Sequence, residues 1–180
     1  MNTLTATNVF RLRSPEEPDM PGLILRRRVE GINRRCQPQK IITSRFKAVA
    51  GYLSLVDTLP LSRGAEAVEL HYFHPHEQLS DLELQLALSS GGLSSDPLAQ
   101  LWDNINHPEF SKAHPNGFHW PDSRGWRFMA FYWSEEKPCV TVDQHNNDQD
   151  WLKSFWFAGV LQPVSLFRPS LLYRLLLLRH

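Results

Sequence analysis

Cysteine is scarce in this chain of 180 residues: Cys36 and Cys139 are the only two, and they stand far apart. Small secreted domains that depend on disulfides are much richer in cysteine. The N-terminus lacks an apolar segment of the signal-peptide type, and no apolar run is long enough to cross a bilayer. We therefore expect two free thiols, a location in the reducing cytoplasm, and no membrane partner.

The motifs of the common enzyme classes are also missing. The sequence has no Gly-x-Ser-x-Gly elbow, no glycine-rich phosphate loop, no His-Glu-x-x-His and no Cys-x-x-Cys. Cys36 lies in a basic segment, where a lowered thiol pKa would favour reactivity, but no general base stands near it in the sequence. We expect a protein without catalytic activity that requires no cofactor.

What the chain does have is enough apolar material for a sizeable core, since 42% of its residues are hydrophobic and 11% are aromatic. Residues 1–22 are polar and carry three prolines, which is typical of a disordered tail. The length suits one domain. We predict a disordered tail at 1–22 followed by a single globular domain at 23–180.

The strongest structural pattern lies at 126–133, where aromatic residues occupy both faces of a potential strand. A charged segment at 134–138 follows, and then alternating residues to about Asp143. Apolar side chains on both faces are typical of a central strand, and the charged segment suits a hairpin connection. We predict an α+β fold: a small, mainly antiparallel sheet with a central aromatic hairpin at about 126–143, and helices packed on it.

Apolar spacing predicts the other elements. Residues recurring every three or four positions indicate a helix from Thr43 to about Val56 and another that starts at Pro97. Alternation predicts a strand at 65–73. Residues 79–89 fit a strand through alternate leucines, or a helix through capping-box spacing, and the helix is favoured.

Three further segments complete the expected layout. Residues 107–125 are rich in His, Pro and Gly and are expected to form a long loop. Residues 149–161 indicate a helix that is apolar on most sides, so it is either buried or covers a partner surface. In the second case it would mediate homo-oligomerisation. The last segment, 170–180, is expected to form a short helix.

Charge is distributed unevenly, although the formal net charge is zero. Eight basic residues face a single acid between positions 23 and 47, so this segment carries +7 and the rest of the chain −7. The eight are Arg26, Arg27, Arg28, Arg34, Arg35, Lys40, Arg45 and Lys47. Arg suits phosphates and carboxylates. We predict that the segment contacts an anionic partner, either nucleic acid or an acidic protein; docking on the protein's own acidic surface and a solvated face are the alternatives.

One short pattern resembles a known enzyme motif. Pro121-Asp122, followed at a distance by Glu135-Glu136-Lys137, is similar to the PD-(D/E)xK motif of the restriction-endonuclease-like nucleases. The resemblance implies that Asp122 and Glu135 hold Mg²⁺ and that Lys137 assists the attacking water. A metal-dependent nuclease is therefore the alternative function.

Histidines supply a second alternative. His71, His74 and His76 lie within six positions, with Glu69 and Glu77 beside them. Imidazole is the commonest side chain in transition-metal sites. The group predicts a metal site, for zinc among others, if it is more than a set of ordinary surface histidines.

Overall fold

The computed structural model describes residues 24–61, 64–145 and 150–162. Strands and helices alternate irregularly along the chain, in agreement with the α+β class. The elements are β1 (Ile24–Val29), α1 (Pro38–Arg45), β2 (Ala48–Gly51), the 3-10 helix η1 (Leu53–Thr58), β3 (Val68–Phe73), α2 (Asp81–Ser90), β4 (Leu93–Ser94), α3 (Pro97–Asn106), α4 (Pro108–Ala113), β5 (Asn116–Asp122), β6 (Gly125–Ser134), β7 (Lys137–Gln144) and β8 (Trp156–Leu161).

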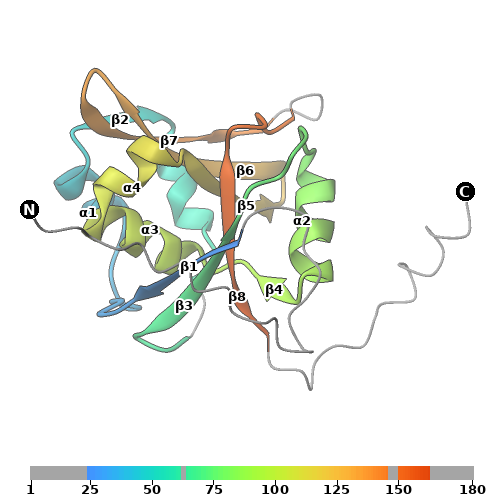
Figure 1. The fold of residues 1–180 in the computed structure, drawn as a ribbon. Helices are drawn as coiled ribbons and strands as arrows, with labels where there is room; N and C mark the ends of the chain where they lie inside the picture. The colour runs from blue at the N-terminus through green and yellow to red at the C-terminus, as the bar shows by residue number, and fades with distance from the viewer. Residues whose placement is uncertain (1–23, 62–63, 146–149, 163–180) are drawn as a thin grey trace, which may run out of the picture.

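All the strands belong to one sheet of eight, in the order β1-β3-β8-β5-β6-β7-β2, and β4 pairs with β8 beside this path. Most neighbours are antiparallel, and only β5–β8 and β2–β7 are parallel. In Figure 1, α1, α3 and α4 lie on one side of the sheet and α2 on the other. The mainly antiparallel sheet with helices packed on it is confirmed.

The aromatic hairpin is confirmed as β6 and β7, which are paired along their length from Ser134 and Lys137 at the turn. β6 lies between β5 and β7, so it is an inner strand as its two apolar faces predicted. The turn is shorter than the predicted 134–138 loop. Only Glu135 and Glu136 form it, with φ values of 50° and 57°, the left-handed region that two-residue hairpin turns require.

Buried side chains form two groups, one on each side of the sheet. The larger lies under α1, η1, α3 and α4 and includes Ile42, Val56, Leu98, Leu101, Phe110, Met129, Phe131 and Val142. The smaller lies under α2 and consists of Phe73, Leu84, Leu88, Leu93, Trp151 and Phe157. The sheet therefore separates two apolar layers, and each helix buries its apolar face against one of them.

The helix predicted from Thr43 to Val56 is wrong. α1 ends at Arg45, and the chain then forms β2 and η1. The apolar residues whose spacing indicated one helix do not share one buried face, because Val49 is an exposed residue of β2. Pairing with β7 decides the conformation of this stretch, and it overrides local helical spacing.

The helix predicted at 149–161 is also wrong, because Trp156–Leu161 is strand β8, between β3 and β5. Phe157 and Ala158 point to opposite faces and are both buried. A strand covered on both faces is a continuous apolar run, which periodicity cannot distinguish from a buried helix. Between residues 150 and 161 there is therefore no helix to carry the predicted oligomer surface, and residues 146–149 lie outside the described part.

The loop predicted at 107–125 is the third error, since it contains α4 and β5. Other predictions are confirmed: β3 matches the strand at 65–73, and α3 begins at Pro97 with Asp96 as its cap. α2 carries the capping box of Ser80 and Glu83, which decides 79–89 in favour of a helix. The predicted tail at 1–22 and the helix at 170–180 lie outside the described residues.

Candidate functional site

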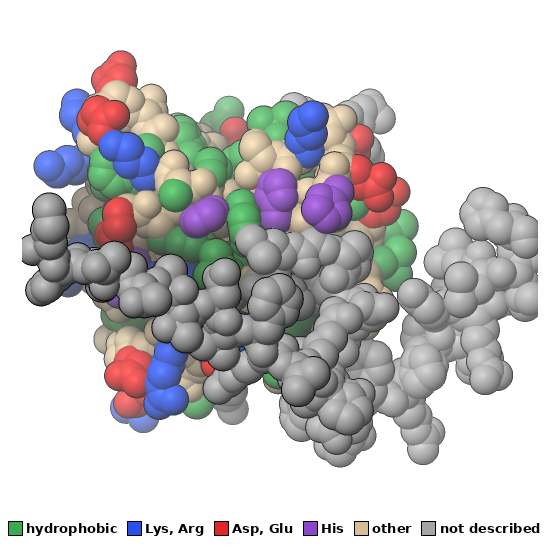
Figure 2. All heavy atoms as spheres, in the orientation of Figure 1, with side chains coloured by type: hydrophobic (Ala, Val, Ile, Leu, Met, Phe, Trp, Pro, Cys, Tyr) green, Lys and Arg blue, Asp and Glu red, His purple; other side chains and the backbone are tan. Residues whose placement is uncertain are grey.

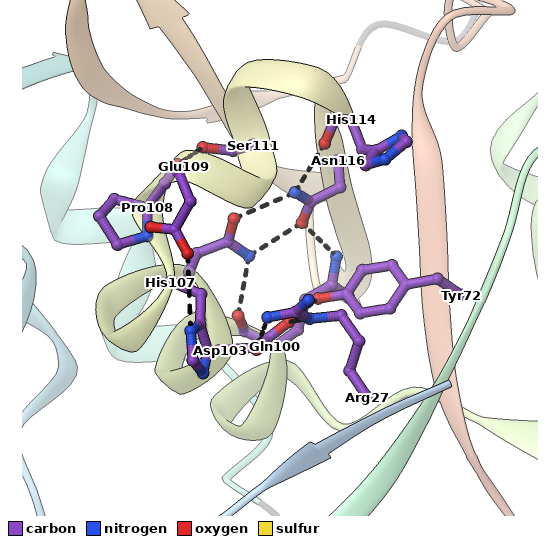
Figure 3. A network of polar contacts seen from close by, with 11 residues as sticks. Arg27, Tyr72, Gln100, Asp103, His107, Pro108, Glu109, Ser111, His114 and Asn116 are labelled. Carbon is purple, nitrogen blue, oxygen red and sulfur yellow. Dashed lines mark hydrogen bonds and ion pairs between the residues drawn. The ribbon is translucent and has the colours of Figure 1, made fainter. Parts of the chain in front are cut away.

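The predicted anionic-partner segment divides into residues that the protein uses itself and residues that face solvent. Arg27, on β1, donates from Nε and Nη2 to the carboxylate of Asp103 on α3, at 2.7 and 3.1 Å. Its guanidinium also lies 4.4 Å from the ring centre of Phe110. Figure 3 shows Arg27 and Tyr72 approaching Asp103 from the sheet side, and the Tyr72 hydroxyl donates to the same carboxylate at 3.0 Å.

Arg34 is likewise paired inside the molecule. Its two terminal nitrogens donate to the two carboxylate oxygens of Asp96, each at 2.6 Å. Asp96 also caps α3 by accepting from the backbone N–H of Ala99 at 3.1 Å. Helix α3 therefore supplies carboxylates, Asp96 and Asp103, to two of the eight predicted residues.

Two more of the eight lie on β1. The side chain of Arg28 forms an exposed ion pair with Glu30, at 2.7 Å. Arg26 is exposed on the same strand. Exposed pairs such as Arg28–Glu30 contribute little to stability, and their charges are already matched locally.

The last four define what we call the cationic surface: Arg35, Lys40, Arg45 and Lys47. All four are exposed, on α1 or beside it. The sequence has no Asp or Glu between positions 31 and 56. None of the four forms an ion pair within the part of the chain that the structure describes. Their charge is therefore not neutralised by neighbouring side chains.

The residues of the nuclease-like motif are not brought together. Asp122 ends β5 opposite Gly125, whereas Glu135 lies in the turn at the other end of β6. With a rise of about 3.3 Å per residue, the length of β6 separates them by about 30 Å. The carboxylate of Asp122 instead accepts from Arg127 Nε at 2.8 Å. Lys137 is in β7, at the same end as Glu135.

The predicted histidine group does not converge either. His71 is buried and contacts Glu69 at 3.0 Å, while His74 packs against Trp156 and His76 is exposed. Burial lowers the pKa of His71, and Glu69 offsets only part of that effect. Histidine side chains are spread across the face in Figure 2 between α4 and α2. Among the described residues, no three His, Cys, Asp or Glu side chains are placed to hold a metal ion.

The surroundings of Cys36 do not favour a reactive thiol. Burial raises the pKa of its thiol, rather than the basic segment lowering it. Its sulfur therefore carries less thiolate than a free cysteine at the same pH.

A polar cluster that the sequence did not predict lies beneath α2. Asp81, the first residue of α2, accepts hydrogen bonds from His119 Nδ1 and His145 Nδ1, both at 2.7 Å. The indole nitrogen of Trp151 donates to the same carboxylate at 3.0 Å. All four residues are buried. We call these residues, from α2, β5, the end of β7 and the segment before β8, the Asp81 cluster.

The electrostatics of the cluster favour an ionised Asp81. Burial alone raises the pKa of its carboxyl, but the hydrogen bonds from His119, His145 and Trp151 outweigh burial and hold that pKa well below the usual range. Both imidazoles therefore use Nδ1–H as the donor, which leaves each Nε2 directed away from the carboxylate. Nε2 of His119 is buried without a hydrogen-bond partner among the described residues.

A second buried network supports α3 on the sheet. The side-chain oxygen of Asn116, the first residue of β5, accepts from Gln100 and Asn104 at 2.9 Å each. The Asn116 amide donates back to the side-chain oxygen of Asn104 at 3.0 Å, and Figure 3 shows the hydrogen bonds that meet at Asn116. Each side-chain amide finds its hydrogen-bond partners within the fold. The network therefore holds α3 against β5 and leaves no polar group free for a ligand.

Comparisons with known proteins give no relative from which to transfer a function. The chain matches no family model, no curated protein and no solved structure. In the described ranges, no helix combines the length and the apolar character that crossing a membrane requires.

Proposed function

We propose that this protein is a non-catalytic, cytoplasmic interaction protein that binds an anionic partner through the cationic surface, Arg35, Lys40, Arg45 and Lys47. One observation carries the proposal: four exposed cations stand in a stretch without acidic residues and form no ion pair with described residues. Such a group creates a local positive potential that attracts anions.

The ion pairs within the protein reduce the number of basic residues that are available to a partner. Arg27 and Arg34 each have a carboxylate partner from α3 at hydrogen-bond distance, so we assign them a structural role. Recruiting either of them to a partner would expose a buried carboxylate, which is costly. Binding is therefore assigned to the residues on and around α1, which are already hydrated and need no rearrangement.

The test uses two polyanions, a duplex DNA and a polyglutamate peptide, each with a fluorescent label. Anisotropy titrations run from about 20 mM to about 200 mM salt, because contacts to several anionic groups give a steep loss of affinity with salt. We expect at least one probe to bind, more weakly at high salt. The reversal Lys40→Glu, Arg45→Glu, Lys47→Glu is expected to weaken that binding at least tenfold.

A second triple variant serves as the matched control, because it changes the net charge by the same amount. Arg28→Glu, Arg124→Glu and Lys153→Glu reverse three exposed cations away from α1 and β2. We expect this variant to keep most of its affinity. If both triple variants lose the same affinity for the probe, binding depends on net charge alone and not on the cationic surface, which contradicts the proposal. If neither probe binds at the lowest salt, the proposal is refuted.

A further inference from the structure

Strand β2 forms one edge of the sheet. It comes last in the strand order, so β7 is its only neighbour among the described strands. An edge strand presents backbone N–H and C=O groups on its open side, and these can bind an added strand. β1 forms the other edge, but its exposed Arg28 is already matched by Glu30.

The register shows which residues of β2 face outward. The backbone N–H of Tyr52 donates to the carbonyl of Val142 on β7 at 2.7 Å. Because alternate residues of a strand bond to the same neighbour, Ala50 and Ala48 also face β7. The backbone groups of Val49 therefore point away from the sheet, whereas Gly51, with a φ of 75°, leaves the extended conformation and ends the open edge.

The surroundings of this open edge are cationic at one end and apolar beyond it. Arg45 and Lys47 immediately precede β2 and are exposed. Val49 and Tyr52 are exposed apolar side chains, at 38% and 66% of their full accessibility. At the far end, the carboxylate of Asp143 lies next to Gly51. Negative charge on a bound segment is therefore favoured near Lys47 and disfavoured near Gly51.

Resting on the proposed function, we propose that the anionic partner is an acidic, extended peptide segment that adds to the open edge of β2, with its acidic side chains towards Arg45 and Lys47. Backbone groups on the open edge complement a peptide backbone, and the exposed Val49 and Tyr52 complement apolar side chains. Phosphates would satisfy the cations but leave both of these features unused. Because β2 is short, few backbone bonds form, and charge supplies a large part of the affinity.

The experiment removes the outward N–H of Val49. Val49→Pro deletes a donor that β7 does not use, and proline is tolerated on edge strands when its nitrogen faces solvent. Val49→Ala is the matched control, because it shortens the side chain and keeps the N–H. The probe is a labelled decapeptide of alternating Glu and Val, and a second version carries N-methyl groups on alternate amides. A duplex DNA is titrated in parallel.

We expect Val49→Pro to weaken peptide binding at least tenfold and Val49→Ala less than threefold. The N-methylated peptide is expected to bind wild-type protein at least tenfold more weakly, which tests the inference even if Val49→Pro does not fold. Unchanged peptide affinity with both the proline variant and the N-methylated peptide would overturn strand addition but leave anionic binding in place. If the protein binds the DNA but not the peptide, strand addition is likewise overturned and anionic binding is kept. If it binds neither probe, both strand addition and the proposed function are overturned.

Discussion

Arg34 and Asp96 form two parallel hydrogen bonds of 2.6 Å, one from each terminal guanidinium nitrogen to one carboxylate oxygen. The side chains are only 11% and 5% exposed. Asp96 also caps α3, so the pair ties the segment between β1 and α1 to the start of that helix. A cation from the basic segment is therefore part of the protein's own framework.

We expect Arg34→Ala to destabilise the protein by about 3 kcal/mol, because it removes the guanidinium from a buried carboxylate. Urea unfolding at neutral pH measures the change in the free energy of unfolding. Arg35→Ala is the control: its side chain is exposed and in no ion pair with described residues, and a change within about 0.5 kcal/mol is expected. Equal effects of the two substitutions would contradict the division of the basic segment.

Local signals in the sequence were sufficient for part of the fold. The β6–β7 hairpin was predictable because its aromatic residues fill both faces of one strand, and α2 and α3 because Ser80 and Asp96 are caps that act within four residues. Segments whose conformation depends on distant partners carry no such local signal. Strand β8 is one of them, because a strand buried on both faces has no period that distinguishes it from a buried helix.

The Asp81 cluster could not have been predicted from spacing. His119 and His145 are 38 and 64 positions from Asp81; the β5–β6–β7 pairing brings the two histidines together, and the packing of α2 on the sheet adds Asp81. The same is true of the cationic surface. All eight basic residues look alike in the sequence, and the carboxylates of α3 distinguish Arg27 and Arg34 from the rest only in the folded chain.

Because Asp81 is buried as a carboxylate, the free energy of unfolding is expected to depend on pH in the acidic range. Its folded pKa is lowered, so its contribution is complete above the usual carboxyl pKa of 3.8 and is lost as the pH falls further. We expect Asp81→Asn to destabilise the protein by about 3 kcal/mol at pH 7, because the charged acceptor of two imidazoles is lost. Urea midpoints of both proteins between pH 7 and pH 3 provide the measurement. The difference should shrink below pH 4, and a difference that stays constant with pH would rule out this role of the carboxylate.

The hairpin turn is strained in a way that substitution can relieve. Glu135 and Glu136 both adopt positive φ, a conformation that costs a residue with a side chain about 1 kcal/mol. Two-residue turns of this kind prefer Asn followed by Gly. We expect Glu135→Asn with Glu136→Gly to stabilise the protein by about 1 kcal/mol, measured by urea unfolding. Glu136→Gln, which removes only the exposed ion pair with Lys112, serves as the control and should change little. A destabilised double variant would contradict the turn geometry.

Gly159 distinguishes the strand from the helix that the sequence predicted. A Cβ at this position would lie 2.8 Å from Cβ of Leu93 and 2.9 Å from the backbone oxygen of Ser94, because β4 lies against β8 as its antiparallel neighbour. The backbone of β4 cannot move aside without breaking its pairing with β8. We expect Gly159→Ala to destabilise the protein by about 2 kcal/mol. In an exposed or loosely packed helix the same substitution would stabilise by up to about 1 kcal/mol, since alanine is the better helix former. The sign of the change in the free energy of unfolding therefore decides between the two structures.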